Sequence, residues 1–223
     1  TGSPWPAGNN STKQTMERAP DFAWQTSESV GGTPRVINSI RDRISERDTI
    51  SDDEDAKSLE ELRLEENARR PAATSSRPDP GEIGSPGEIR SPVADSYPQC
   101  SYETSVSPRG GVLRLNEIAW MGTTRDANDE WFEIFNGSGG DIDVSGWQIL
   151  DKAEQIYVTL GAGTKVSSDG YLLFERTDDN SVPGVSADLI YTGGLGNSDE
   201  GLRLFDSSCV LIDEVVANNL WEA

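Results

Sequence analysis

The second half of the chain is a series of short apolar and β-branched runs separated by turn-forming residues. Runs such as VLRLNEIAW, EWFEIFN, YLLFER and GLRLFD are each long enough for one strand. The clusters between them, at 136–141, 161–170 and 194–201, are rich in glycine, asparagine, aspartate and serine, which favour turns. A series of about eight such strands with no helical segment between them predicts an all-β fold with antiparallel sheets packed face to face.

Alternation within the runs supports this interpretation. Ile156, Val158 and Leu160 fall on one face of a strand, with Tyr157 and Thr159 on the other. Such a period of two is typical of a strand with one buried face. The residues that we expect in the structural core are Trp147, Ile149, Leu173, Leu202 and Leu204.

The chain before Val112 has a different composition. Residues 39–111 are rich in charged residues, proline, serine and glycine, which predicts a long, disordered linker. Within it, residues 51–70 favour a solvated single helix, because Ser51 suits an N-cap, acids follow it and arginines end the stretch. Residues 1–38 have too few large apolar groups for a core, so Met16, Phe22 and Trp24 are expected to bury against another surface.

Several spaced motifs in the second half occur in an order that suggests a family. They are Asn116-Glu117-Ile118, the run from Asn128 to Ile134, the run from Asp143 to Trp147, and the run from Tyr171 to Arg176. Together they resemble the lamin tail domain in its bacterial form. The resemblance implies an immunoglobulin-like β-sandwich, found in nuclear lamins and in many secreted or surface-anchored bacterial proteins. It implies a module with no shared catalytic residues.

The chain departs from the family pattern at its end. The family's domain usually continues past a Trp-x-Ala-Gly turn into a Met-Glu-Arg strand, and here those pieces stand at Trp5 to Gly8 and Thr15 to Arg18. The resemblance therefore implies that residues 1–38 are the end of a preceding copy, and that 112–223 are one copy truncated at its C-terminal end. We expect residues 1–38 to dock on the sandwich as its closing strand, which makes neighbouring copies candidate partners.

Composition narrows the function. The chain has 39 acidic and 19 basic residues, and a net charge of −20 disfavours binding to nucleic acid. It has no histidine, which removes the commonest general base, and two cysteines cannot form a four-cysteine metal site. No apolar stretch is long enough to span a membrane. We therefore expect no cofactor and no enzymatic activity.

Two acidic motifs offer candidate sites. Asp126, Asn128, Asp129 and Glu130 carry oxygen ligands of the kind that calcium prefers, but their spacing lacks the glycine and terminal glutamate of an EF-hand, so capped turns are favoured. The run from Asp141 to Val144 has the paired aspartates of a phosphatase. Glycines rather than an apolar strand precede it, which favours a turn.

Glutamates inside strands are a third candidate. Glu117, Glu133 and Glu175 are able in principle to act as acid and base, but we expect them to be exposed to solvent or paired with Arg114 or Arg176. An enzyme becomes the better interpretation only if a concave pocket gathers two carboxylates with strongly shifted pKa values. Among the tryptophans, Trp147 is expected in the core, while Trp120 or Trp131 is a candidate for an exposed ligand groove.

The two cysteines predict a disulfide between Cys100 and Cys209, which would join the end of the linker to a turn of the sandwich. An extracellular or cell-surface location would follow. The favoured function is a non-catalytic binding, anchoring or spacer module of a bacterial protein, with a protein or cell-envelope partner. The alternative is an accessory domain of a secreted nuclease or phosphatase whose catalytic unit lies outside these residues.

Overall fold

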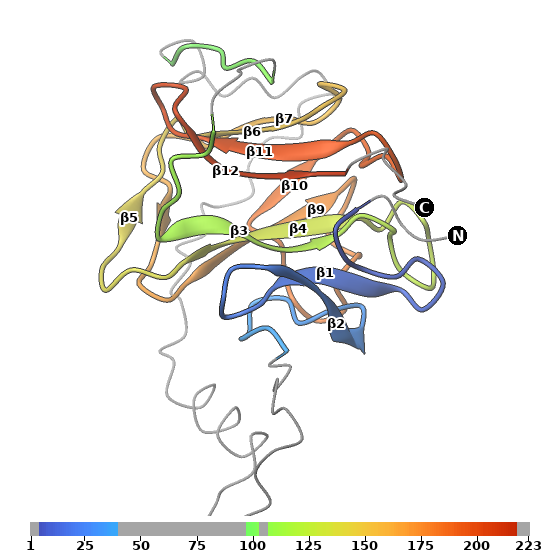
Figure 1. Ribbon diagram of the computed structural model, residues 1–223. Helices are drawn as coiled ribbons and strands as arrows, with labels where there is room; N and C mark the ends of the chain where they lie inside the picture. The colour runs from blue at the N-terminus through green and yellow to red at the C-terminus, as the bar shows by residue number, and fades with distance from the viewer. Residues whose placement is uncertain (1–4, 40–96, 103–106, 218–223) are drawn as a thin grey trace, which may run out of the picture. The chain divides into compact units, whose positions relative to one another are not determined.

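The computed structural model describes residues 5–39, 97–102 and 107–217 (Figure 1). Within these ranges the chain forms twelve strands and no helix. The described residues belong to one compact unit. A second unit, 42–89, lies outside them, and so does the helix expected over 51–70.

The larger sheet joins both ends of the described chain. Its strand order is β10-β9-β4-β3-β1-β2, so β1 and β2 extend a sheet built mainly from residues after Val112. The bounds are β1 Gln14–Arg18, β2 Trp24–Val30, β3 Leu113–Ala119, β4 Trp131–Asn136, β9 Tyr171–Arg176 and β10 Leu189–Tyr191.

A four-stranded sheet of order β12-β11-β6-β7 lies beside the larger sheet, and β5 and β8 form a separate pair (Figure 1). The bounds are β5 Ile142–Asp143, β6 Gln148–Asp151, β7 Tyr157–Thr159, β8 Lys165–Val166, β11 Gly201–Phe205 and β12 Leu211–Val216. The predicted all-β sandwich is confirmed. One pairing differs from the antiparallel expectation: β10 runs parallel to β9, because residues 177–188 carry the chain back along β9 until Leu189 pairs with Phe174.

The core fills the space between the two larger sheets. Phe132 and Phe174 stack at a centroid distance of 4.7 Å. Four of the residues expected in the core, Ile149, Leu173, Leu202 and Leu204, are fully buried. Trp147 is only half-buried and packs against the border of the core, next to the turn that enters β6.

Trp120 and Trp131 are both buried, with exposed fractions of 2% and 1%. The expectation that one of them lines an exposed groove is therefore wrong. The rings of Trp120 and Trp5 stack with centroids 6.2 Å apart. Trp120 is therefore part of the surface on which the N-terminal segment packs.

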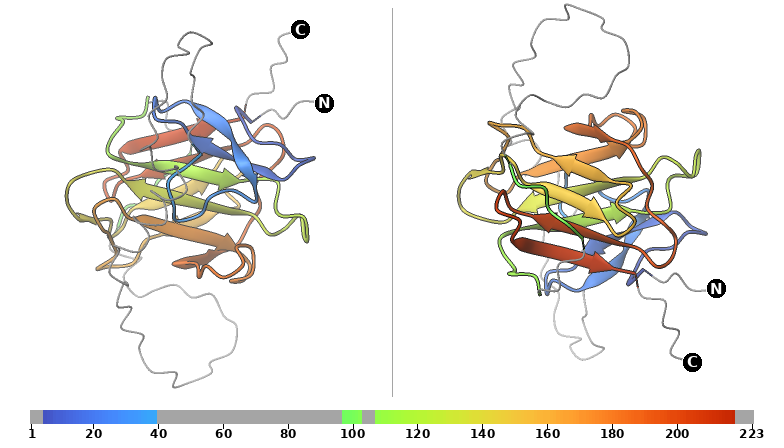
Figure 2. Two further views of the ribbon diagram at one scale, coloured as in Figure 1. Left: turned by 90° about the horizontal axis from the view of Figure 1, so that it is seen from below. Right: turned by 90° about the horizontal axis from the view of Figure 1, so that it is seen from above.

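The N-terminal segment docks on the sandwich, as the sequence predicted. Strand β1 lies beside β3 and pairs antiparallel with it (Figure 2). Met16 lies opposite Ile118 and is fully buried. Trp24 packs partly buried against the core. The expectation is wrong for Phe22, which is 58% exposed: it adopts a left-handed backbone conformation, with φ of 65°, in the turn between β1 and β2.

The predicted disulfide joins Cys100 to Cys209, with their Cα atoms 5.2 Å apart. It packs beside Leu150, Phe205 and Leu211 in a small apolar cluster at the outer side of the four-stranded sheet. Gln148 holds the same stretch by accepting a hydrogen bond from Cys100 N at 2.9 Å and donating one to Pro98 O at 2.6 Å. The stretch before the sandwich is thereby fastened to β6 and to the β11–β12 turn.

Candidate functional site

A row of three buried glutamates crosses the larger sheet. Register places Glu17 of β1 opposite Glu117 of β3, and Glu117 opposite Glu133 of β4. The exposed fraction of each of the three is 0%. They share the face opposite the core, because their neighbours Ile118 and Phe132 point inward.

A β-bulge brings Glu117 to this face. The register shifts between Leu115 and Glu117, so that Leu115 lies opposite Ile134 while Glu117 lies opposite Glu133. Regular alternation from Leu115 would point Glu117 into the core. The extra residue, Asn116, reverses that direction.

Glu117 takes its hydrogen bonds from the N-terminal segment. Thr33 donates from its backbone N to both carboxylate oxygens, at 2.9 and 3.1 Å, and from its hydroxyl at 3.0 Å. The Thr15 hydroxyl contacts Oε1 of the same carboxyl group. Residues of the N-terminal segment therefore satisfy a carboxyl group of the sandwich.

The two neighbouring glutamates are bonded in the same way. Glu133 accepts from Arg35 N at 2.8 Å and from Asn116 Nδ2 at 2.7 Å. Glu17 accepts from Gln25 Nε2 at 3.0 Å, and its Oε2 lies 3.3 Å from the Thr33 hydroxyl oxygen. The stretch from Thr33 to Ser39 thus covers the row.

Burial raises the pKa of Glu117 to about 8, although the bonds from Thr15 and Thr33 act in the opposite direction. Burial also raises the pKa of Glu133 well above its ordinary value, and the neighbouring charge of Glu117 adds to the shift. Each carboxyl group disfavours ionisation of the other. Glu117 and Glu133 therefore favour their protonated forms at neutral pH.

Raised pKa values and paired carboxyl groups are features of acid–base sites, but the row is sealed from solvent. A general acid or base needs hydrogen-bond reach to its substrate. Here the oxygens of Glu117 and Glu133 face Thr15, Thr33, Arg35 N and Asn116 instead. These hydrogen bonds hold the N-terminal segment against the sheet.

The expectation of solvent exposure or arginine pairing for Glu117, Glu133 and Glu175 is wrong. The Arg114 guanidinium lies over the rings of Phe22 and Phe135, at 4.9 and 4.8 Å from their centroids. Arg176 pairs with a different acid, Glu130, at 3.1 Å.

Glu130 and Glu175 lie in another part of the sandwich. Glu130 accepts from Leu195 N at 2.7 Å, and burial raises its pKa to about 7 against the lowering effects of that bond and of Arg176. Glu175 accepts from Ser181 N at 2.8 Å, and burial raises its pKa too. These two carboxyl groups anchor the loops that follow β9 and β10.

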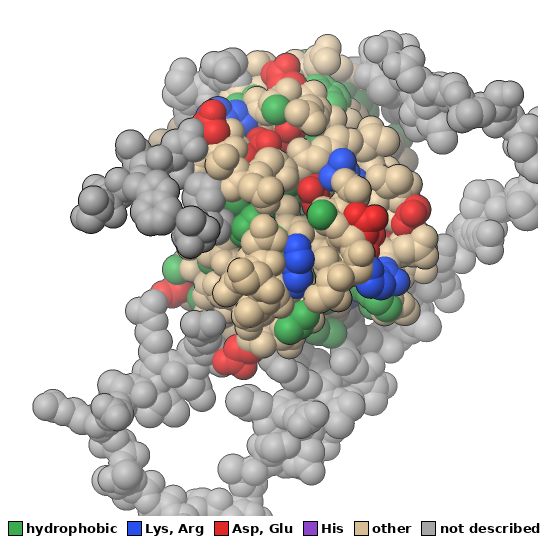
Figure 3. All heavy atoms as spheres, turned by 90° about the vertical axis from the view of Figure 1, so that its right-hand side faces the viewer, with side chains coloured by type: hydrophobic (Ala, Val, Ile, Leu, Met, Phe, Trp, Pro, Cys, Tyr) green, Lys and Arg blue, Asp and Glu red, His purple; other side chains and the backbone are tan. Residues whose placement is uncertain are grey.

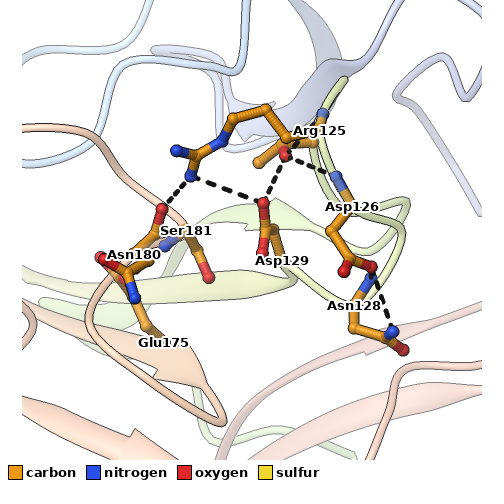
Figure 4. A network of polar contacts seen from close by, with 8 residues as sticks. Arg125, Asp126, Asn128, Asp129, Glu175, Asn180 and Ser181 are labelled. Carbon is orange, nitrogen blue, oxygen red and sulfur yellow. Dashed lines mark hydrogen bonds and ion pairs between the residues drawn. The ribbon is translucent and has the colours of Figure 1, made fainter.

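In the candidate calcium loop, the side chains of Asp126 and Asp129 accept hydrogen bonds from other residues of the same loop (Figure 4). Asp126 accepts from the backbone and side-chain nitrogens of Asn128, at 2.8 and 3.0 Å. Asp129 accepts from the Thr123 hydroxyl at 2.6 Å and lies 3.6 Å from Arg125. Glu130 points elsewhere, toward Arg176. The structure thus does not bring the four candidates together, and among the described residues no group of three or more acids or cysteines is placed to hold a metal.

The paired aspartates at Asp141 and Asp143 accept hydrogen bonds from nearby loops. Asp143 accepts from the backbone N and the hydroxyl of Ser145, at 2.9 and 2.5 Å, and Asp141 accepts from Ser168 N at 3.1 Å. The hydrogen bonds from Ser145 lower the pKa of the exposed Asp143. Asp143 therefore serves the turn that follows β5, whereas Asp141 joins the loop before β5 to the loop after β8.

Sequence reasoning missed the partners of the buried row and one ion pair. Arg18 donates to both oxygens of Asp213 at 2.9 Å, joining β1 to the opposite sheet at β12. The position of the glutamates inside apolar strands could have indicated that such partners exist, because a buried carboxyl group needs hydrogen-bond donors. That signal does not identify the donors, because they lie far away in the sequence.

The face on the right-hand side of Figure 1 carries acidic, basic and apolar side chains interspersed (Figure 3). They are not gathered into a single large patch on the face shown. In the described part of the chain, no helix has the length and apolar character needed to cross a membrane.

Comparison with known protein families gives a match over the second half of the chain. A family model described as Lamin Tail Domain matches residues 107–219, which covers β3 to β12 and both strands that flank the disulfide turn. No curated protein matches the chain.

Proposed function

The chain belongs to the lamin tail domain family, and from that premise we propose that it is a non-catalytic binding, anchoring or spacer module of an extracellular or cell-surface bacterial protein. The observation that carries the proposal is the disulfide between Cys100 and Cys209. Disulfides form and persist mainly outside the cytoplasm, where thiols are not kept reduced.

The use of the carboxyl groups supports a module without chemistry of its own. Glu117 and Glu133 are buried and hydrogen-bonded to the N-terminal segment, and Asp126 and Asp129 cap a loop. These groups stabilise the sandwich. Such a rigid domain is suited to holding a protein or cell-envelope partner at a fixed place on its surface.

A thiol-trapping experiment tests the location. Cells that produce the protein are treated with a membrane-permeant maleimide of known mass, and the protein is then denatured and weighed before and after reduction. We expect no added mass before reduction and two added groups when labelling follows reduction. Labelling of both cysteines without reduction would contradict the location.

An activity test addresses the rest of the proposal. The full chain is assayed on phosphomonoesters, phosphodiesters and glycosides beside a Glu117→Gln variant and a Glu133→Gln variant. We expect no turnover from any of them. A rate that the wild type shows and both variants lose would establish an enzyme and overturn the proposal.

A further inference from the structure

We propose that residues 5–39, here called the donor segment, exchange between copies of this chain, so that the donor segment of one copy docks on the sandwich of another. The docking place, here called the acceptor surface, is defined by Glu117, Trp120, Asp188, Gly196 and Asp213. This inference concerns an interaction surface and does not depend on the location or the catalytic status proposed above.

The two components recognise each other first through a tryptophan contact. The Trp5 ring stacks on Trp120, and Trp5 Nε1 donates to Gly196 O at 2.9 Å. Trp120 Nε1 in turn donates to Ala7 O at 3.3 Å. Both indole rings are buried by the contact. Contacts of this kind combine large apolar burial with satisfied polar groups.

Charge complementarity adds specificity. The donor segment contains three basic residues, and each bonds to the acceptor side: Arg18 to Asp213 at 2.9 Å, Arg35 to Asp188 at 2.6 Å, and Lys13 to the backbone oxygen of Met121 at 2.8 Å. The acceptor side supplies acids at the first two places. In a chain with a net charge of −20, this pairing distinguishes the donor segment from most other segments of the sequence.

An empty acceptor surface would be costly. Without β1, the edge of β3 exposes unpaired backbone groups, which favours pairing with another strand. Glu117 would lose the donors Thr15 and Thr33, and Asp213 would lose Arg18. A donor segment from any available copy satisfies the same groups.

The covalent connection permits exchange. Residues 40–96, 57 in all, separate the end of the donor segment from the next described residue, Tyr97. A chain of that length spans at most about 200 Å when fully extended. None of the contacts above involves those 57 residues, so the same contacts form whether the donor segment is a chain's own or another's.

Concentration then decides between the two forms. Tethering of the donor segment to its own sandwich corresponds to an effective concentration on the order of 1 mM. Monomers therefore dominate in dilute solution. Refolding at a concentration near 100 μM should give exchanged dimers at roughly a tenth of the monomer, about tenfold more than at 10 μM.

Charge reversal tests the proposal. An Arg18→Glu variant and an Asp213→Arg variant each break their own ion pair, but in a mixture each donor segment fits the acceptor surface of the other variant. After unfolding and joint refolding of the full chains, with the disulfide kept oxidised, we expect native mass spectrometry to show a heterodimer. The heterodimer should exceed either variant's homodimer at least tenfold.

The double variant Arg18→Glu/Asp213→Arg restores the pair within one chain and serves as the control, which should refold as the wild type does. A second arm uses two wild-type samples that differ in isotope content, so the test survives if a variant fails to fold. Joint refolding should give mixed-isotope dimers in an amount that rises with concentration. Only monomers in both arms, or dimers that form equally well in every combination of variants, would overturn the proposal.

Discussion

At the scale of single residues, the contribution of Glu117 to the stability of the fold depends on pH. Burial raises its pKa to about 8, well above that of an exposed glutamate. The folded chain therefore binds a proton that the unfolded chain releases at neutral pH. The stability from this group is fully present below about pH 4.5 and is lost as pH rises through about 8.

We expect Glu117→Gln to remove this dependence. The change should make the variant increasingly stable relative to the wild type between pH 5 and 9, by at most about 1.4 kcal/mol per pH unit. Urea unfolding at pH 5, 7 and 9 measures it, and Glu28→Gln, at an exposed position of β2, is the control. A constant difference between Glu117→Gln and the wild type across this range would show that Glu117 is ionised when folded.

The calcium loop gives a second prediction at this scale. Its acids already accept hydrogen bonds from Asn128 and Thr123, so added calcium should leave the melting temperature of the full chain unchanged. A ligand that binds only the folded state raises that temperature. A rise on adding millimolar calcium, absent in an Asp129→Ala variant, would establish a metal site.

At the scale of elements, the turn after β2 depends on Gly32. Its φ is +80°, and an added Cβ would lie 2.1 Å from Glu117 Oε1. Gly32→Ala should therefore displace the stretch that covers the buried row and lower the free energy of unfolding by about 2–4 kcal/mol, from backbone strain and lost hydrogen bonds.

Gly31 offers a matched control for this prediction. It has the same φ of +80°, but an added Cβ would meet nothing within 4 Å. Gly31→Ala should cost only the backbone strain, about 1 kcal/mol. Equal losses in the two variants, measured by chemical unfolding, would show that the contact with Glu117 is unimportant.

The disulfide belongs to the same scale, because it joins the stretch before β3 to the β11–β12 turn across 109 residues. Replacing both cysteines with serine should lower stability by about 2–5 kcal/mol. Urea unfolding measures the loss. A reducing agent should bring the wild type to the stability of the variant and leave the variant unchanged. If reduction has no effect on the wild type, the bond does not contribute to stability.

At the scale of the whole molecule, the described part of the N-terminal segment, residues 5–38, completes the sandwich, and residues 1–38 are the segment to delete. Deleting them removes the buried side chains of Trp5 and Met16 and exposes the edge of β3. We expect a loss of several kcal/mol and increased aggregation. The substitution Met16→Ala in the full chain should lower the free energy of unfolding by about 2–5 kcal/mol. This variant tests the same role if the deleted form does not fold. An unchanged melting temperature in both would contradict the closing role of the segment.

Local patterns in the sequence were sufficient for most of the sandwich. Alternating apolar residues and turn clusters predicted eight of the strands from Leu113 to Val216, because strand propensity and turn chemistry act between near neighbours in the chain. The two-residue strands β5 and β8 lie where turns were expected, because only their pairing with each other makes them strands. The motifs resembled the family that matches residues 107–219. The pairing of Cys100 with Cys209 also followed, since only two cysteines were available.

Tertiary structure decided what depends on distant partners. A single extra residue in β3 turns Glu117 away from the core, and alternation alone would have placed it inside. The donors that make its burial tolerable, Thr15 and Thr33, stand about a hundred residues earlier and reach it only when β1 pairs with β3. Sheet edges accept many strands with similar backbone bonds. The choice of neighbour therefore rests on side-chain contacts, such as Arg18 with Asp213, that exist only in the assembled fold.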